Sequence, residues 1–148
     1  DVNSVWIGSA NGGLYRFENN QLQVLTQENV GLPSNRILSL MVAPDRSLYV
    51  GTDAGLARFA RGEFAPVAGV PEVPISALAQ GPDGSLWAAT TSAGTWTQPA
   101  GVQPTRAWTE AESDAGALPS AARALTVDLF GGVWIGTENA GLVRFAPE

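Results

Sequence analysis

The sequence contains no cysteine and no histidine among its 148 residues. The missing cysteines exclude disulfides and thiolate chemistry. The missing histidines exclude Ser-His-Asp triads, Cys-His pairs and zinc sites built on imidazole, and they remove the commonest general base near neutral pH. These absences favour a protein that is not an enzyme and that has neither a cofactor nor a metal site.

Lysine is also absent, so all eight basic residues are arginines, set against 14 acidic residues. The net charge of -6 argues against nucleic acid as a partner, because phosphate binding depends on clustered basic side chains. The sequence has no run of about 18 apolar residues for a membrane span, and its first residues lack the features of a signal peptide. We expect no direct membrane contact, and any targeting or anchoring segment would lie outside this chain.

A two-part phrase occurs four times along the chain. Its clearest copy reads Val-Trp-Ile-Gly-Thr at residues 133–137 and Gly-Leu-Val-Arg-Phe at residues 141–145. The aromatic residues at the shared position are Trp6, Tyr49, Trp87 and Trp134, which gives steps of 43, 38 and 47 residues. A period of about 40 to 45 residues is typical of β-propellers.

The pattern within each repeat favours strands over helices. The best-preserved unit divides into short runs at residues 37–42, 48–52, 56–59 and 64–67, separated by turn residues such as Pro44 and Asp45. Pro66 is tolerated only in an outer edge strand. The sequence therefore predicts an all-β fold whose blades each have four antiparallel strands.

The chain is expected to form one propeller segment of about 3.5 blades. The predicted repeat units are residues 1–30 (partial), 31–69, 70–116 and 117–148 (partial). In the third unit the fourth strand is predicted near residues 102–108, followed by an insertion near 110–116. Incomplete sheets expose unpaired strand edges. We therefore expect the ring to be completed by sequence beyond either end or by a second copy, so a homo-oligomer is favoured.

Three segments together resemble the two-component regulator propeller repeat. They are Gly-Leu-Pro-Ser-Asn-Arg-Ile at residues 31–37, Asp-Leu-Phe-Gly-Gly-Val-Trp-Ile-Gly-Thr at residues 128–137, and the Gly-Leu-Val-Arg-Phe that follows. Some positions depart from the pattern: Ala43 and Gly81 replace the aspartate found at Asp128, and Ala88 and Ala89 replace Ile-Gly.

The resemblance implies a non-catalytic, ligand-binding sensor module in the extracytoplasmic or periplasmic part of a bacterial receptor. The cytoplasmic part of such receptors is a histidine kinase or a diguanylate cyclase, and some members recognise oligosaccharides. The family has no catalytic residues in these blades. Its propellers typically have seven blades, and the remaining blades of the same receptor would then be partners.

Two alternatives remain open. The first is a self-assembling propeller fragment, of natural or engineered origin, that acts as an oligomerisation scaffold. The second is a propeller-type lyase, because residues 81–87 are similar to the repeat of streptogramin lyases. The chain offers no histidine for lyase chemistry.

Four residues are predicted to bind ligand. Arg36 and Arg123 stand at the start of inner strands, near the expected channel mouth, and arginine suits carboxylate, sulfate and polyhydroxyl groups. Trp96 and Trp108 lie outside the repeated aromatic position and are free to stack on a ligand or to join an interface.

Other prominent residues are predicted to be structural. The repeated aromatic residues, together with Phe17, Phe59 and Phe145, are expected to pack between blades. Arg16, Arg58 and Arg144 share one repeat position and are expected to pair with nearby carboxylates. Asp45 and Asp83 are expected to form turns. The acidic cluster of Glu110, Glu112 and Asp114 is interpreted as solvated surface rather than a metal site.

Overall fold

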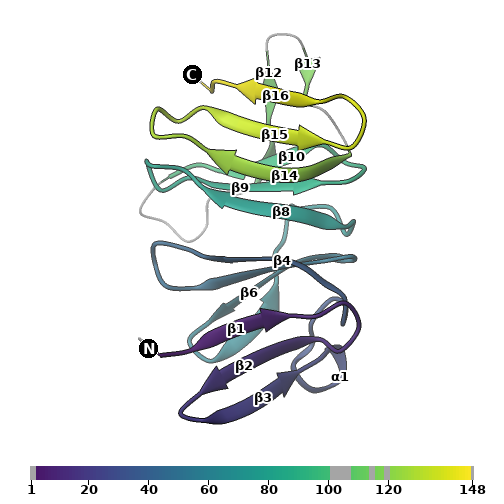
Figure 1. Ribbon diagram of the computed structural model, residues 1–148, viewed down its shortest axis with the longest axis vertical. Coiled ribbons are helices and arrows are strands. Elements are labelled where there is room, and N and C mark those ends of the chain that lie inside the picture. The colour runs from purple at the N-terminus through teal and green to yellow at the C-terminus, as the bar shows by residue number, and fades with distance from the viewer. Residues whose placement is uncertain (1–2, 101–107, 114–115, 119–120, 148) are drawn as a thin grey trace.

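The computed structural model describes residues 3–100, 108–113, 116–118 and 121–147. Its regular structure is almost entirely β, with four antiparallel sheets of three or four strands stacked along the longest axis of the molecule and one separate two-stranded hairpin (Figure 1). Within each sheet, strands that follow one another in the chain pair with each other. The prediction of an all-β partial propeller is confirmed.

The four sheets follow one another in chain order, and we name them A to D. Sheet A contains β1 (Val5–Gly8), β2 (Leu14–Glu18) and β3 (Gln21–Leu25). Sheet B contains β4 (Ile37–Val42), β5 (Leu48–Thr52), β6 (Gly55–Ala60) and β7 (Glu63–Pro66). Sheet C contains β8 (Ile75–Gln80), β9 (Leu86–Thr90), β10 (Thr95–Gln98) and β11 (Thr109–Glu110). Sheet D contains β14 (Ala122–Val127), β15 (Val133–Thr137) and β16 (Leu142–Phe145).

The innermost strands β4, β8 and β14 lie beside one another and join the sheets near the expected axis. The Ser39 hydroxyl of β4 donates a hydrogen bond of 2.9 Å to the Ile75 carbonyl of β8. Each inner strand also has a register shift after its first residue, which is typical of a β-bulge. The bulged residues are Leu38, Ser76 and Arg123.

The last residue of the repeated phrase builds the hairpin that follows it. The Thr52 hydroxyl donates to the Gly55 carbonyl at 2.8 Å and accepts from the Ala54 amide at 3.1 Å. The same pair of bonds recurs in the other three sheets, where the hydroxyl belongs to Ser9, Thr90 or Thr137. One short polar side chain thus adds its own hydrogen bonds to the backbone pairing across each turn.

Aromatic contacts fill the spaces between successive sheets. Trp6 of sheet A meets Phe59 of sheet B edge to face, with ring centroids 5.3 Å apart. Trp87 of sheet C meets Phe145 of sheet D in the same way at 6.2 Å. Tyr49, Phe59 and Trp87 all belong to the buried or partly buried packing between sheets. The predicted packing role of these aromatic residues is therefore confirmed.

Two aromatic residues of the repeat do not fit that prediction. Phe17 is exposed and Trp134 is only half-buried. Phe17 lies on the face of sheet A that points away from sheet B, and Trp134 lies on the face of sheet D that points away from sheet C. The prediction of packing between sheets was wrong for both residues, because neither face packs against another of the four sheets.

Element boundaries differ from the sequence prediction in the third unit. Residues 101–107 lie outside the described residues, and the fourth strand is β11, which pairs with Trp96 and Thr97 of β10. Glu110 therefore belongs to a strand and not to the insertion. The insertion itself forms a two-stranded hairpin of β12 (Glu112–Ser113) and β13 (Gly116–Ala117). Asp114 lies outside the described residues.

One short helix, α1 (Gln27–Val30), interrupts the β structure between sheets A and B. Thr26 and Asn29 form a reciprocal capping box at its start, and Gly31 ends it in the left-handed conformation. This single turn was not predicted, because four residues are too few to produce a helical pattern in the sequence.

Candidate functional site

The loops that precede the inner strands lie along one side of the sheet stack, next to the hairpins between the second and third strands. We call them the lead-in loops, and we call this side of the stack the lead-in end. The Arg36 carbonyl accepts from the Asp53 amide of the β5–β6 hairpin at 3.3 Å, and the Asn35 carbonyl accepts from the Gly13 amide of sheet A at 2.9 Å. The Ala121 amide donates to the Thr91 carbonyl of sheet C at 2.8 Å. The lead-in loops of sheets B and D therefore fasten those sheets to a hairpin of the sheet before them, and Arg36 also fastens its loop to the hairpin of its own sheet.

The Gly-Leu-Pro-Ser-Asn segment at residues 31–35 has a structural explanation. Leu32 is buried in the core between sheets A and B. The Asn35 side chain accepts from the Gln27 amide at 2.7 Å and donates to the Glu28 carboxylate at 3.3 Å. These contacts fix the path of the chain from α1 into β4, so this motif positions the lead-in loop.

Three arginines at one repeat position form ion pairs, as predicted. Arg58 lies 2.6 Å from Asp45, and Arg144 lies 3.1 Å from Asp128. Arg16 pairs with Glu18 at 3.2 Å. Each guanidinium also lies over the aromatic residue of its own sheet, at 5.2 to 5.9 Å from the ring centroid. The arginines therefore act in the packing of the sheets.

Asp128 is the most strongly perturbed carboxylate described. It accepts a hydrogen bond from the Trp134 indole at 2.9 Å and from the backbone amides of Phe130 and Gly132. The bond from Trp134 is the largest cause, and together these donors lower the pKa of Asp128 to about 2. The ionised carboxylate thus links the β14–β15 turn to Trp134 and Arg144.

Asp45 and Asp83 form turns, as predicted. Each accepts hydrogen bonds from the amide and hydroxyl of the serine two residues later, Ser47 or Ser85. Burial raises the pKa of Asp45, but its bonds from Ser47 and its contact with Arg58 outweigh that effect and lower it. Bonds from Ser85 lower the pKa of Asp83.

The structure separates the two arginines that were predicted to bind ligand. Arg36 is exposed at the end of the lead-in loop before β4. Arg123 is also exposed, but it stands within β14 at the bulge and pairs with Glu138 at 2.9 Å. They occupy different repeat positions in sheets B and D. The proposal that they bind ligand stays a prediction.

The two tryptophans are integrated into sheet C and its contact with sheet B. Trp108 is buried beside Tyr49, with ring centroids 6.0 Å apart. Trp96 is half-buried against the same core, and its indole donates to the Ala93 carbonyl at 2.8 Å. Trp108 therefore offers little free surface, whereas part of the Trp96 ring is accessible. Their ligand role also stays a prediction.

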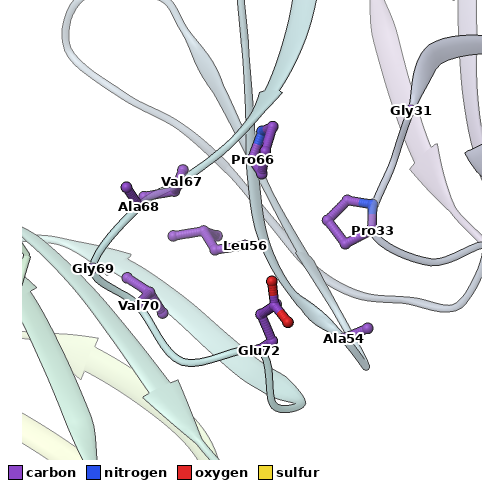
Figure 2. Close-up of a pocket in the computed structure, with 11 residues that line it drawn as sticks. Gly31, Pro33, Ala54, Leu56, Pro66, Val67, Ala68, Gly69, Val70 and Glu72 are labelled. Atoms are coloured by element: carbon purple, nitrogen blue, oxygen red, sulfur yellow. The ribbon is translucent and has the colours of Figure 1, made fainter.

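A cavity of about 590 Å³ opens beside sheet B at the lead-in end of the stack (Figure 2). Gly31 and Pro33 come from one lead-in loop, and Ala54 comes from the β5–β6 hairpin. The chain that follows β7 closes the other side and contributes Val70 and Glu72. The side chains that line it are apolar except for Glu72, whose carboxylate is directed between them (Figure 2).

The sequence did not single out this cavity. None of Arg36, Trp96, Trp108 and Arg123 is among the described residues that line it. Its walls come from two successive lead-in loops, and residues 70–74 of the second match the repeat pattern only poorly. A repeat alignment of both loops is the signal that would have placed Pro33 near Glu72.

Among the described residues, no cluster of three or more metal-ligating side chains is present. In the same part of the chain, no helix has the length and apolar character needed to cross a membrane.

No protein-family model matches this chain, and no curated protein sequence matches it. Solved structures do. The chain aligns with the extracellular domain of BT3049 from B. thetaiotaomicron, assigned as a hybrid two-component system, with a TM-score of 0.74 and 22% identity. That alignment covers 97% of this chain and 19% of the BT3049 domain.

Enzymes of propeller architecture also align. An ancestral GH74 enzyme gives a TM-score of 0.71 at 18% identity, covering 97% of this chain and 21% of the enzyme. Virginiamycin B lyase from Staphylococcus aureus gives 0.65 at 13% identity, covering 96% of this chain and 51% of the lyase. The chain thus spans about one fifth of the BT3049 domain and half of the lyase. At these identities the alignments establish a shared fold.

Proposed function

We propose that this chain is part of a non-catalytic sensor propeller in the extracytoplasmic region of a bacterial receptor. The observation that carries the proposal is that the repeated polar residues serve structural contacts. The arginines of the repeat hold carboxylates and cover aromatic rings, and the hydroxyls of the repeat close hairpins. The similarity to the extracellular domain of BT3049 supports the sensor assignment.

The lead-in end of the stack is the proposed ligand face. Exposed Arg36 lies there next to the β5–β6 hairpin, and the cavity with Glu72 opens on the same hairpin. Arginine provides a planar set of donors for carboxylate, sulfate or vicinal hydroxyl groups. An oligosaccharide that carries one acidic group fits this face, because the acidic group pairs with the Arg36 guanidinium and neutral hydroxyls donate to the Glu72 carboxylate in the cavity.

The proposal is tested by calorimetric titration of the chain with a panel of neutral, uronic-acid and sulfated oligosaccharides. Arg36→Gln should weaken binding of an acidic oligosaccharide by about tenfold or more, because a charge-assisted hydrogen bond is lost. Arg46→Gln is the matched control. It removes the same charge in the β4–β5 turn, at the opposite end of sheet B, and should leave binding unchanged.

Two results would contradict this function. Hydrolysis or elimination of any oligosaccharide by the chain, abolished by replacing one aspartate or glutamate, would make it an enzyme. Equal loss of binding in the Arg36 and Arg46 variants would show that the lead-in end is not the ligand face.

A further inference from the structure

The two end faces of the sheet stack carry large apolar side chains that are exposed among the described residues. Strands β1 to β3 form one end, and β14 to β16 form the other, where the β12–β13 hairpin also lies (Figure 1). Strand register places the exposed side chains of sheet A on a single face. These are Val5, Ile7, Phe17, Leu22 and Val24, and we call this surface the Phe17 face.

The Phe17 face matches faces that are buried elsewhere in the same chain. Ile7 corresponds in the repeat to Val50 of sheet B and Ile135 of sheet D. Both of those residues are 0% exposed because the preceding sheet covers them, whereas Ile7 is 49% exposed. The sequence therefore provides a core-type surface at a place where the described residues supply no covering sheet.

At the opposite end, a residue is again exposed although its equivalent in another sheet is buried. Sheet D directs Trp134 and Leu142 away from sheet C, and we call this surface the Trp134 face. Leu142 corresponds to Leu56 of sheet B, since both pair with the glycine of the repeated phrase. Leu56 is 2% exposed and Leu142 is 66% exposed.

The contacts inside the chain show how these two faces fit. Trp6 contacts both Phe59 and Phe64 of the next sheet, at 5.3 and 6.4 Å between ring centroids. Phe17 and Leu22 pair across β2 and β3 as Phe59 and Phe64 pair across β6 and β7. Sheet D carries the tryptophan half of this contact, and sheet A carries the partner half.

We propose that the chain binds a second copy of itself head to tail. The Trp134 face of one copy packs on the Phe17 face of its partner, and Trp134 takes the place that Trp6 holds against sheet B. Two such contacts, related by a two-fold axis, bring together the four sheets of each copy. A ring of eight sheets lies within the range that propellers adopt. This interface does not depend on which ligand the module binds.

The interface is tested by sedimentation velocity and native mass spectrometry of the full chain. The wild type should have twice the monomer mass over a broad concentration range. Phe17→Arg and Leu142→Arg should each weaken self-association by about tenfold or more, since each places a charge on an apolar contact. Phe130→Arg is the control, because Phe130 is exposed in the β14–β15 hairpin and belongs to neither face.

Mixing the two interface variants distinguishes head-to-tail pairing from pairing of like faces. The Phe17→Arg copy keeps its Trp134 face, and the Leu142→Arg copy keeps its Phe17 face. The mixture should therefore form a mixed dimer through one intact contact. If Leu142→Arg alone still dimerises fully, the Phe17 faces pair with each other and the proposal fails.

A monomeric wild type would also overturn the proposal, and so would open filaments, because they would show that the contact does not close a ring. Near-UV circular dichroism must show that each variant keeps its tertiary packing. Leu22→Arg provides a second variant of the Phe17 face if Phe17→Arg does not fold, and it should give the same loss of association.

Discussion

The arginine at the shared repeat position forms an ion pair in three sheets, but its carboxylate partner differs from sheet to sheet. The arginine of the repeat pairs with a turn aspartate in sheets B and D, but with Glu18 of its own strand in sheet A. Asp128 makes the largest set of contacts among these carboxylates, because it accepts hydrogen bonds from the turn backbone, the Trp134 indole and the Arg144 guanidinium. A charged group is thus tolerated beside an aromatic ring because every lone pair has a donor.

Asp128 gives the chain a pH-dependent contribution to stability. Its pKa is about 2 in the folded protein and 3.8 in its ordinary state, so folding favours the ionised form. This contribution is fully present above pH 3.8 and is lost as the pH falls towards 2. Urea unfolding between pH 6 and pH 2 should show that the stability gap between wild type and Asp128→Asn narrows with acid. A gap of constant size would show that the charge of Asp128 is unimportant.

The hydroxyl of the repeated phrase should matter in proportion to its burial. Thr52→Val keeps the shape of the side chain but leaves the Gly55 carbonyl and the Ala54 amide without their partner. We expect a loss of about 1 to 2 kcal/mol in the free energy of unfolding. Thr137→Val removes the same bonds at an exposed hairpin, where water replaces them, and should cost less. Equal losses in urea unfolding would contradict this reasoning.

At the scale of strands and sheets, close approach at the glycine of the phrase sets how neighbouring sheets dock. A Cβ atom added to Gly8 would lie 2.6 Å from Ile37 Cγ2 and 3.1 Å from Ile37 Cβ at the start of β4. The equivalent atom on Gly136 would meet only Ala124 of its own sheet, at 3.5 Å. Glycine at position 8 is therefore required by the neighbouring sheet, whereas glycine at position 136 is not.

This difference predicts opposite outcomes for one substitution at two repeat positions. Gly8→Ala should destabilise the chain by about 1 to 3 kcal/mol, because β4 must move away from β1. Gly136→Ala should be close to neutral. Thermal unfolding followed by circular dichroism measures both, and a large loss for Gly136→Ala would show that sheet D is already covered in solution by a sheet with its own inner strand.

At the scale of the whole molecule, the two faces of each sheet differ in the side chains that they present, and the order of the faces is the same along the stack. Every sheet presents a tryptophan or tyrosine on one face and aliphatic or phenylalanine side chains on the other, apart from the irregular third strand of sheet C. The stack therefore ends in two unlike surfaces that complement each other. This polarity is what makes a head-to-tail assembly the natural way to cover both.

Self-association should make thermal stability depend on protein concentration. If the dimer is the folded form that heat unfolds, the melting temperature should rise as the concentration of the chain is increased. The melting temperature of the Phe17→Arg variant should change less with concentration than that of the wild type, because its dimer is weaker. Differential scanning calorimetry over a hundredfold range of concentration tests this, and a constant melting temperature for the wild type would contradict it.

The sequence by itself was sufficient for the fold class, most strand positions and the ion pairs. The inner strand at residues 37–42 and the strand at residues 48–52 have the predicted boundaries, since turn residues bound them sharply. The pairing of Arg58 and Arg144 was also predictable, because a cation repeated in register has a structural reason in each sheet. Local chemistry and periodicity carry this information.

Tertiary structure alone decided which aromatic residues are covered and where a cavity opens. Phe17 and Phe59 share a repeat position, yet only Phe59 has a sheet packed against it. Trp108 appeared free in the sequence because it follows no repeat, and it is buried beside Tyr49, from a different sheet. The cavity beside Glu72 depends on two loops far apart in the chain. Burial depends on which faces meet in space, and a periodic sequence gives equivalent residues the same pattern whether or not a neighbour covers them.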